Sequence, residues 1–550
     1  MSTPRPRILP VALAAFLLAS IAAACGSQAM PRSGEAAETR LRGTVSDSAA
    51  RPLPGIFVTA RDAARRVAVS VLTDAKGRYE LPPLTAAVYR LEAHGYGFQP
   101  AARDSVAADG AADLDFVLSR QSGGLEPPNS SAWLRSLPDG KTKRRFILDC
   151  TGCHQFSAPV ARVEGRPRTR AEWVASVEKM LSFAGAQTGF PIISPERESQ
   201  ATADWLVTSL AESGDPGEAA GAPAPAAERG ASSEVARAVF TEYDLPQPGE
   251  LPHDLILDRA GRVIVTGMFG HVMYRLDPAS GAYEEIPIPV PQANPRALEI
   301  DPQGVWWVLL GGPEKMARFD PAGGDWKTYD IGMYPHSIAL DREGRIWYNG
   351  HFTKDPIELG SLDTATGEMR TYDLPPNPET VGSPIPYELR VAPDGSLWIS
   401  ELVGNRIVRF DPASGESRAW TMPSPDSGPR RLDVAADGTL WIPTYSGGSL
   451  VVFDPRTERF TEHPLPTRDA LPYVARVDPK SGAVWVAEAG ADAIARFEPA
   501  TKRWTEFPLP TGSSLIRHMD IDPATGAVWA AYANAPPVTP KVIRLEPGTR

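Results

Sequence analysis

Cysteine is scarce in this sequence, which has three in 550 residues: Cys25, Cys150 and Cys153. A small secreted domain stapled by disulfides needs a denser framework than this. Two of the three cysteines fall in one short motif and the third ends an apolar leader, so no pair is left for a disulfide. Packed cores must therefore hold the chain together, and a hydrophobic content of 42% is ample for them.

Positive charge is also in short supply, since the formal net charge is -11. The basic clusters are short, as at 141–145, whereas a nucleic-acid partner would require a concentrated basic face. Beyond the leader, no apolar run is long enough to cross a bilayer. We therefore predict no nucleic-acid partner, and membrane contact only through an N-terminal lipid anchor.

The N-terminus has the pattern of an export signal. Arg5 and Arg7 precede an apolar run over 8–24 that is short for a membrane span. The small residues before Cys25 resemble a bacterial lipobox, which implies that Cys25 is lipidated. We expect residues 1–25 to be a signal peptide and the protein to be exported, either periplasmic or anchored to the outer membrane as a lipoprotein.

The motif Cys150-Thr151-Gly152-Cys153-His154 carries the strongest chemical signal. A C-x-x-C-H sequence attaches c-type haem through two thioethers, and its His supplies an axial imidazole to the iron. The alternative is a redox-active C-x-x-C pair followed by a chance His. Thioredoxin-like pairs sit in a βαβ context, which this sequence does not show. The motif therefore predicts haem c.

Two helices are predicted after the motif, over 169–184 and 195–210. This order makes residues 132–211 resemble a small, all-α class I cytochrome c. The resemblance implies that a Met completes the coordination of the iron, and Met180 is the only Met between 121 and 229. With both axial positions filled, we expect electron transfer with a redox partner protein or a small-molecule electron donor, and no activation of O₂.

The segment before the haem motif reads as β structure. Residues 39–120 alternate apolar and polar positions between turns, including Pro54-Gly55 and Thr73–Leu81. They resemble the carboxypeptidase regulatory-like domain, a transthyretin-like β-sandwich, to which we assign a structural role. Residues 212–236 are rich in Ala, Gly, Pro and Glu and are predicted to be a linker.

Residues 237–550 contain an internal repeat of about 43 residues, a period typical of propeller blades. An acidic residue marks the end of one strand in each unit: Asp277, Asp320, Asp363, Asp411, Asp454, Glu498 and Glu546. A strand at 239–245 precedes the first unit, and pairing it with the last unit would close the ring. We predict a multidomain, mainly β protein whose C-terminal part is a seven-bladed β-propeller.

The repeats resemble virginiamycin B lyase, a streptogramin lyase, at Pro252-His253, Pro335-His336, Trp398–Glu401 and Trp485–Glu488. The resemblance implies a propeller whose His and Glu side chains act with Mg²⁺ in an elimination reaction. The sixth and seventh units depart from the Pro-His pattern, because they begin with Pro472-Tyr473 and Arg517-His518. We therefore carry over the fold and leave the reaction open.

The start of the innermost strand of each blade should face the central channel. Together with neighbouring positions and strand ends, this predicts the following channel residues: His253, Arg296, His336, Tyr387, Glu388, Glu401, Arg430, Tyr473, Glu488, Arg517 and His518. Such a convergence favours a small-ligand site. The alternative is a channel lined by polar residues around water.

These features favour an exported monohaem c-type cytochrome that transfers electrons and has a ligand or substrate site in its propeller. The alternatives are a carbon-oxygen lyase resembling virginiamycin B lyase and a non-catalytic surface protein that binds glycans or partners. A quinoprotein dehydrogenase is disfavoured, since some of those propellers require cysteines and this one contains none.

Overall fold

The computed structural model describes residues 40–85, 88–108, 114–121, 129–212, 232–533 and 539–548. The predicted signal peptide with Cys25 and most of the predicted linker lie outside these ranges. Residues 39–550 form one compact unit, which is mainly β. Within the described ranges, no helix has the length and hydrophobicity needed to span a membrane.

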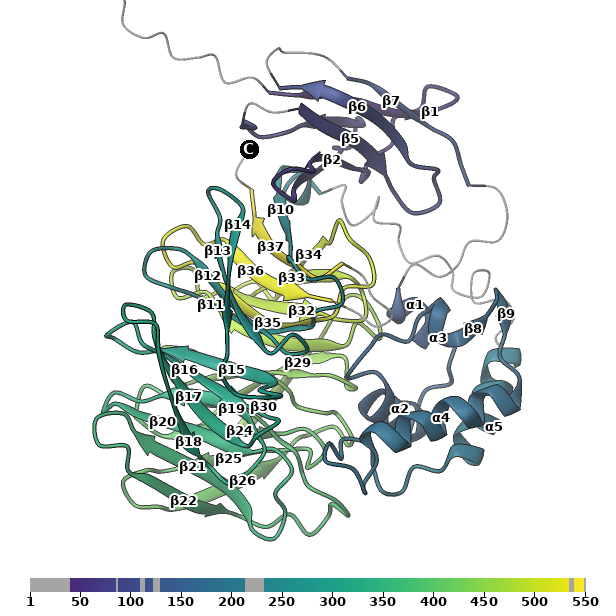
Figure 1. The fold of residues 1–550 in the computed structure, drawn as a ribbon. Coiled ribbons are helices and arrows are strands. Elements are labelled where there is room, and N and C mark those ends of the chain that lie inside the picture. The colour runs from purple at the N-terminus through teal and green to yellow at the C-terminus, as the bar shows by residue number, and fades with distance from the viewer. Residues whose placement is uncertain are drawn as a thin grey trace, which may run out of the picture. The chain divides into compact units, whose positions relative to one another are not determined.

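The C-terminal part is built from repeated four-stranded antiparallel sheets (Figure 1). The first three sheets contain β11 (Pro252–Leu257), β12 (Val263–Gly267), β13 (Val272–Asp277) and β14 (Ala282–Pro287); β15 (Pro295–Ile300), β16 (Trp306–Leu310), β17 (Lys315–Asp320) and β18 (Asp325–Asp330); and β19 (Pro335–Leu340), β20 (Arg345–Gly350), β21 (Ile357–Asp363) and β22 (Met369–Leu374). The next three contain β23 (Pro386–Val391), β24 (Leu397–Glu401), β25 (Arg406–Phe410) and β26 (Ser417–Thr421); β27 (Asp433–Val434), β28 (Leu440–Thr444), β29 (Ser449–Asp454) and β30 (Arg459–Pro464); and β31 (Pro472–Val477), β32 (Val484–Glu488), β33 (Ala493–Glu498) and β34 (Arg503–Pro508).

The remaining repeat consists of β35 (Ile516–Ile521), β36 (Val528–Tyr532) and β37 (Lys541–Glu546). Strand β10 (Val239–Asp244) pairs antiparallel with β37, which confirms the predicted pairing of the first strand with the last repeat. The first strands of successive sheets are neighbours, and β35 in turn lies beside β11. The sheets therefore form a closed, propeller-like ring.

A D-x-x-G-x-x-W pattern occurs in the repeats, as at Asp341–Trp347. It has a local structural cause between β19 and β20. One oxygen of Asp341 accepts backbone N–H bonds across the turn, and the other accepts from the indole Nε1 of Trp347 at 2.8 Å. Gly344 occupies the turn with a φ of 81°, which favours glycine. One carboxylate thus holds the turn and satisfies the buried indole.

The N-terminal part is a β-sandwich. Its strands are β1 (Arg42–Asp47), β2 (Phe57–Asp62), β3 (Val67–Leu72), β4 (Arg78–Glu80), β5 (Val88–His94), β6 (Ala101–Ala107) and β7 (Phe116–Leu118). One sheet has the order β4-β1-β7, and the other, β3-β2-β5-β6, continues into the propeller because β3 pairs with β10. The sandwich and the last repeat therefore share one eight-stranded sheet.

A helical segment connects the sandwich to the ring. It comprises α1 (Ser130–Leu134), α2 (Lys141–Cys150), α3 (Ala158–Ala161), the short strands β8 (Arg162–Val163) and β9 (Arg166–Pro167), α4 (Arg170–Ala184), α5 (Ser199–Glu212) and the 3₁₀ turn η1 (Val235–Arg237). Helix α4 matches the helix predicted over 169–184 and begins with a capping box between Thr169 and Glu172. Helix α5 starts four residues later than predicted, because 194–197 form a turn closed by a bond from Arg197 N to Ser194 O.

The helical segment and the ring share one hydrophobic core. Phe146, Phe156 and Trp173 of the helical segment pack in the same buried cluster as Tyr445 and Tyr473 of the ring. A shared core of this kind fixes the end of α2 against the propeller, which places the C-x-x-C-H motif.

Candidate functional site

The C-x-x-C-H motif begins where helix α2 ends. Cys150 is the last residue of the helix, and the Thr151 N–H still bonds to Ile147 O. Thr151 is fully buried, and its carbonyl oxygen accepts a bond of 2.7 Å from the Tyr445 hydroxyl of the propeller. The motif is therefore a turn anchored to the ring.

Hydrogen bonds from the side chains of Gln155 and Arg517 also hold this turn. The Gln155 side-chain amide donates to the carbonyl oxygens of Ala489 (2.5 Å) and Ser514 (3.1 Å), and Arg517 Nη2 donates to Cys153 O at 2.7 Å. Gly152 lies directly against Arg430, since a Cβ on Gly152 would sit 2.7 Å from Arg430 Nη2. A side chain at position 152 would thus collide with a buried guanidinium.

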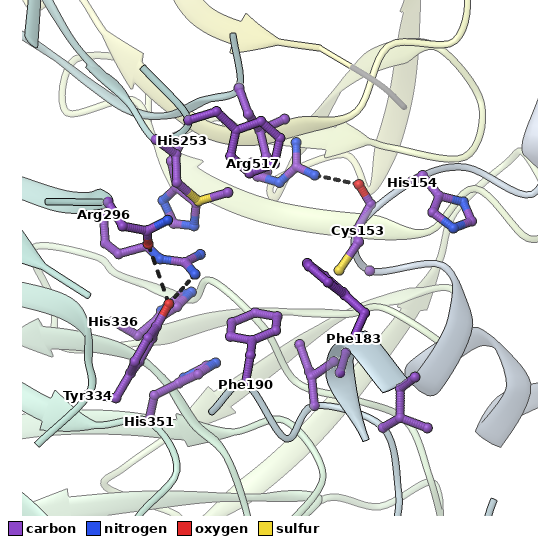
Figure 2. A pocket seen from close by; sticks show the side chains of 18 of the residues that line it. Cys153, His154, Phe183, Phe190, His253, Arg296, Tyr334, His336, His351 and Arg517 are labelled. Atoms are coloured by element: carbon purple, nitrogen blue, oxygen red, sulfur yellow. Dashed lines mark hydrogen bonds between the residues drawn. The ribbon is translucent and has the colours of Figure 1, made fainter. Parts of the chain in front are cut away.

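A cavity of about 1020 Å³ lies between the motif and the propeller. Figure 2 shows Cys153 and Phe183 on one side of it, and Arg296, Tyr334, His336 and His351 across from them. Its apolar walls include Phe183 and Phe269, which are 61% and 55% exposed. A mainly apolar cavity with a few convergent polar groups is the usual form of a small-molecule site.

The donor groups at the motif suit a covalently attached haem. Cys150 and Cys153 are both free thiols, and both line the cavity with His154. His154 Nδ1 donates to Gln155 O at 3.1 Å, because a carbonyl can only accept, and this leaves Nε2 with its lone pair. Ligating histidines commonly have their second nitrogen held in this way.

The thiol environment differs from that of a redox-active C-x-x-C pair. Burial raises the pKa of Cys150 to about 12. Disulfide oxidoreductases instead rely on a thiolate with a lowered pKa. The protonated, half-buried Cys150 therefore does not match the thioredoxin-like alternative.

Two methionines line the cavity. Met180 comes from helix α4 and is half-buried, as expected for a side chain that reaches a site on one face of an amphipathic helix. Met268, which follows β12 of the propeller, is buried and lines the same cavity. Met268 is thus a second thioether side chain, besides Met180, that lines this cavity.

Three buried imidazoles of the propeller line the cavity: His253, His336 and His351. The rings of His336 and His351 are stacked, with centroids 4.2 Å apart. Burial lowers the pKa of His253 and of His351 to about 3, and that of His336 well below its usual value. All three are therefore neutral near pH 7.

In each of these imidazoles Nδ1 is bound to an acceptor. The partners are Asp254 Oδ1 for His253 (2.8 Å), Tyr387 O for His336 (2.9 Å) and Pro386 O for His351 (2.9 Å). Since Nδ1 donates in each bond, Nε2 carries the lone pair. The cavity wall thus presents imidazole acceptors to a ligand.

The predicted channel residues divide among three environments. The large cavity is lined by His253, Arg296, His336, Tyr387, Tyr473 and Arg517. A separate cavity of about 280 Å³ is lined by Glu388 and His518, together with Asp254 and Arg431. Arg430, Glu401 and Glu488 are buried and are not among the lining residues of either cavity.

Ion pairs account for two of the predicted acidic residues. Glu401 is bound by Arg406 Nε at 2.6 Å and by the Asn377 amide at 3.1 Å. Glu388 lies 3.0 Å from Arg390 and 3.6 Å from Arg431. These carboxylates are thus already engaged by neighbouring side chains.

Several residues that line the cavity were not predicted from the sequence, and Phe190, Tyr334 and His351 are three of them. His351 directly follows Gly350, which pairs with Pro335 just as Glu401 pairs with Pro386. His351 therefore lies one residue beyond the strand-end position that was used to predict Glu401. Phe190 comes from the loop after α4 and shows no pattern in the sequence that would place it beside the propeller.

The donor set for the Mg²⁺ implied by the lyase resemblance does not assemble in the described ranges, where no three His, Cys, Asp or Glu side chains are grouped as a metal site requires. We derive no step through such an ion.

Comparison with known proteins agrees with this architecture. Residues 281–539 match the virginiamycin B lyase family, and residues 40–119 match the carboxypeptidase regulatory-like domain. No curated protein matches the chain. The chain is similar to a streptogramin B lyase structure, with a TM-score of 0.51 and 23% identity over 57% of this chain and 100% of the other.

A second solved structure is similar over the same region. It is the selenomethionine-substituted virginiamycin B lyase from Staphylococcus aureus, with a TM-score of 0.50 and 24% identity over 56% of this chain and 99% of the other. At this level of identity the similarity establishes the lyase-like propeller fold. The β-sandwich region likewise has the predicted carboxypeptidase regulatory-like character.

Proposed function

We propose that this protein is an exported c-type cytochrome that transfers electrons between a haem at Cys150, Cys153 and His154 and a ligand or partner at the propeller. The supporting observation is that one cavity is lined both by this motif and by polar residues of the propeller. Haem attached there would supply one-electron redox chemistry. The chain itself would hold the attachment turn rigid through Tyr445, Gln155 and Arg517.

This proposal includes several finer assignments. The helices of 132–211 would form a cytochrome c-like domain, with Met180 as the second axial ligand. The four-stranded units, including β35-β36-β37-β10, would be the blades of a seven-bladed propeller. A signal peptide at residues 1–25 and a lipidated Cys25 would place the protein in the periplasm or at the outer membrane.

A reduced-minus-oxidised visible spectrum tests the proposal most directly. The full chain is produced with c-haem maturation, beside a Cys153→Ala variant that keeps one of the two thiols. We expect a low-spin c-type spectrum, and a pyridine haemochrome band that shifts in the variant because one thioether is lost. A wild-type protein without covalent haem under these conditions would refute the proposal.

The match at 281–539 favours carbon-oxygen lyase activity as a second candidate function. A general base must lie within hydrogen-bond reach of the proton that it removes. The neutral imidazoles of His253, His336 and His351 line the cavity and are candidates for this role. Ring opening of a streptogramin B, measured by mass spectrometry with and without Mg²⁺, tests it. If the wild type and a His336→Gln variant open the ring at the same rate, catalysis by this cluster is excluded.

A further inference from the structure

Two buried arginines in the large cavity have donors without partners. Arg296, on β15, and Arg517, on β35, are 6% and 4% exposed and line the cavity from different sheets. Arg296 Nε and Arg517 Nη1 are buried and form no hydrogen bond. Within the part of the chain that the structure describes, neither guanidinium is paired with a carboxylate.

The described acidic side chains that line the same cavity form no ion pair with these arginines. Glu250 accepts from the backbone N–H groups of Leu251 and Phe269, at 2.7 and 2.8 Å, and from the Tyr274 hydroxyl. Asp149 is bound by Arg197. Glu250 keeps its negative charge, since its hydrogen-bond donors are neutral, and it stands against the two buried guanidinium groups of Arg296 and Arg517. The excess charge of these three groups is therefore positive, and burying an unpaired cation is costly.

We propose that Arg296 and Arg517 bind carboxylate groups in this cavity, and that these carboxylates are the two propionates of the haem. This assignment rests on the proposed function. Guanidinium groups bind carboxylates through paired, charge-assisted hydrogen bonds. Arg517 Nη2 already donates to the carbonyl oxygen of Cys153, which fixes the guanidinium and leaves its buried Nη1 for a carboxylate.

Arg296 is held in place for the same task on the other side of the cavity. Its Nη2 bonds to the Tyr334 hydroxyl, and its guanidinium lies over the rings of Phe190 and Tyr334 at 5.2 and 5.3 Å (Figure 2). These contacts fix the plane of the guanidinium while Nε remains without a partner. The cavity therefore suits a molecule with two carboxylates and a broad apolar body, which describes haem.

A free dicarboxylate in the cavity would use the same chemistry, and the experiment separates the two sources. The full chain is matured with haem as wild type, Arg296→Gln, Arg517→Gln and the charge-preserving Arg296→Lys and Arg517→Lys. Arg456→Gln is the control, because Arg456 lies on an exposed turn of the propeller. Melting curves establish that each variant is folded.

The midpoint potential is then measured between pH 5 and 9. Loss of a cation beside the haem favours the oxidised state, so we expect each Gln variant to shift the reduction equilibrium about tenfold, which is 59 mV for one electron. Its potential should also gain pH dependence, as a propionate released from arginine titrates in the assay range. The Lys variants should retain most of the wild-type behaviour, and Arg456→Gln all of it.

Succinate added to the haem-loaded wild type identifies the source of the carboxylates. No change in potential supports propionates as the occupants, whereas a saturable shift that Arg517→Gln abolishes assigns the arginines to a free dicarboxylate. If haem is attached but both Gln variants behave as wild type, the arginine assignment is overturned and the proposed function stands. If no haem is attached, the proposed function and the propionate assignment fail together. In that case, succinate is added to the wild type and to Arg517→Gln. Stabilisation of the wild type alone would show that the arginines bind carboxylates.

Discussion

Acidification should destabilise the fold through the buried imidazoles of the cavity wall. The pKa of His253 and that of His351 are lowered to about 3 by burial, against about 6.5 in an unfolded chain. Between these values the unfolded chain binds a proton that the folded protein does not, so stability falls as the pH falls below 6.5. Each histidine should cost about 2 kcal/mol between pH 8 and pH 5.

Together these two side chains account for about 4 kcal/mol, and His336 adds to the loss in the same direction. Glu299 opposes it, since burial raises its pKa to about 7 and its stabilising protonation is lost as the pH rises through that value. Because these effects oppose each other in the wild type, the test compares the pH dependence of unfolding free energy between variants. His253→Gln and His351→Gln should each flatten the acid limb by about 1.4 kcal/mol per pH unit near pH 5.

Urea unfolding followed by tryptophan fluorescence measures this limb from pH 8 to pH 5. Glu299→Gln is the matched variant of opposite sign, and it should steepen the loss of stability on acidification. An acid limb with the same slope in wild type, His253→Gln and His351→Gln would refute the argument that these imidazoles stay neutral in the folded protein.

Three further predictions concern single side chains. Met180→Leu should open the sixth coordination position and change the haem spectrum and potential, while Met268→Leu should not; the reverse result would assign the ligand to the propeller. Gly152→Ala places a Cβ 2.7 Å from Arg430 Nη2. Overpacking of this kind should lower the free energy of unfolding in urea by about 1–3 kcal/mol and reduce haem incorporation. Unchanged stability would show that Arg430 can move aside. Asp341→Ala leaves the buried Trp347 indole without its acceptor and should lower the free energy of unfolding by about 3 kcal/mol. Asp437→Ala, at an exposed turn, should lower it by less than about 1 kcal/mol. Equal effects would contradict the role given to Asp341.

The parts of this protein that could be predicted from sequence are those whose contacts are local. Asp341, Gly344 and Trp347 lie within seven residues and form one turn, so their spacing alone identifies the strand that follows. The capping box of Thr169 and Glu172 is equally local. The repeat also predicted the pairing of Val239–Asp244 with the last unit, since a closed ring has one place for an extra strand.

The composition of the site depends on contacts that no local pattern records. Tyr334, His351 and Phe190 reach the cavity because packing against other elements sets their direction. Glu388 followed the predicted register, yet Arg431 and Arg476 from later parts of the chain lie 3.6 and 3.4 Å from its carboxylate. Side-chain direction and charge pairing between sheets follow from the tertiary packing of residues far apart in the chain.

The sequence by itself thus determined the C-x-x-C-H motif, the repeat and the positions of the turns, because each can be read from the order of residues along the chain. The tertiary structure decided that the C-x-x-C-H turn lies against the propeller and that Arg296 and Arg517 remain without carboxylate partners among the described residues. The physical reason is that a shared hydrophobic core, which no single segment contains, sets the arrangement of motif and ring.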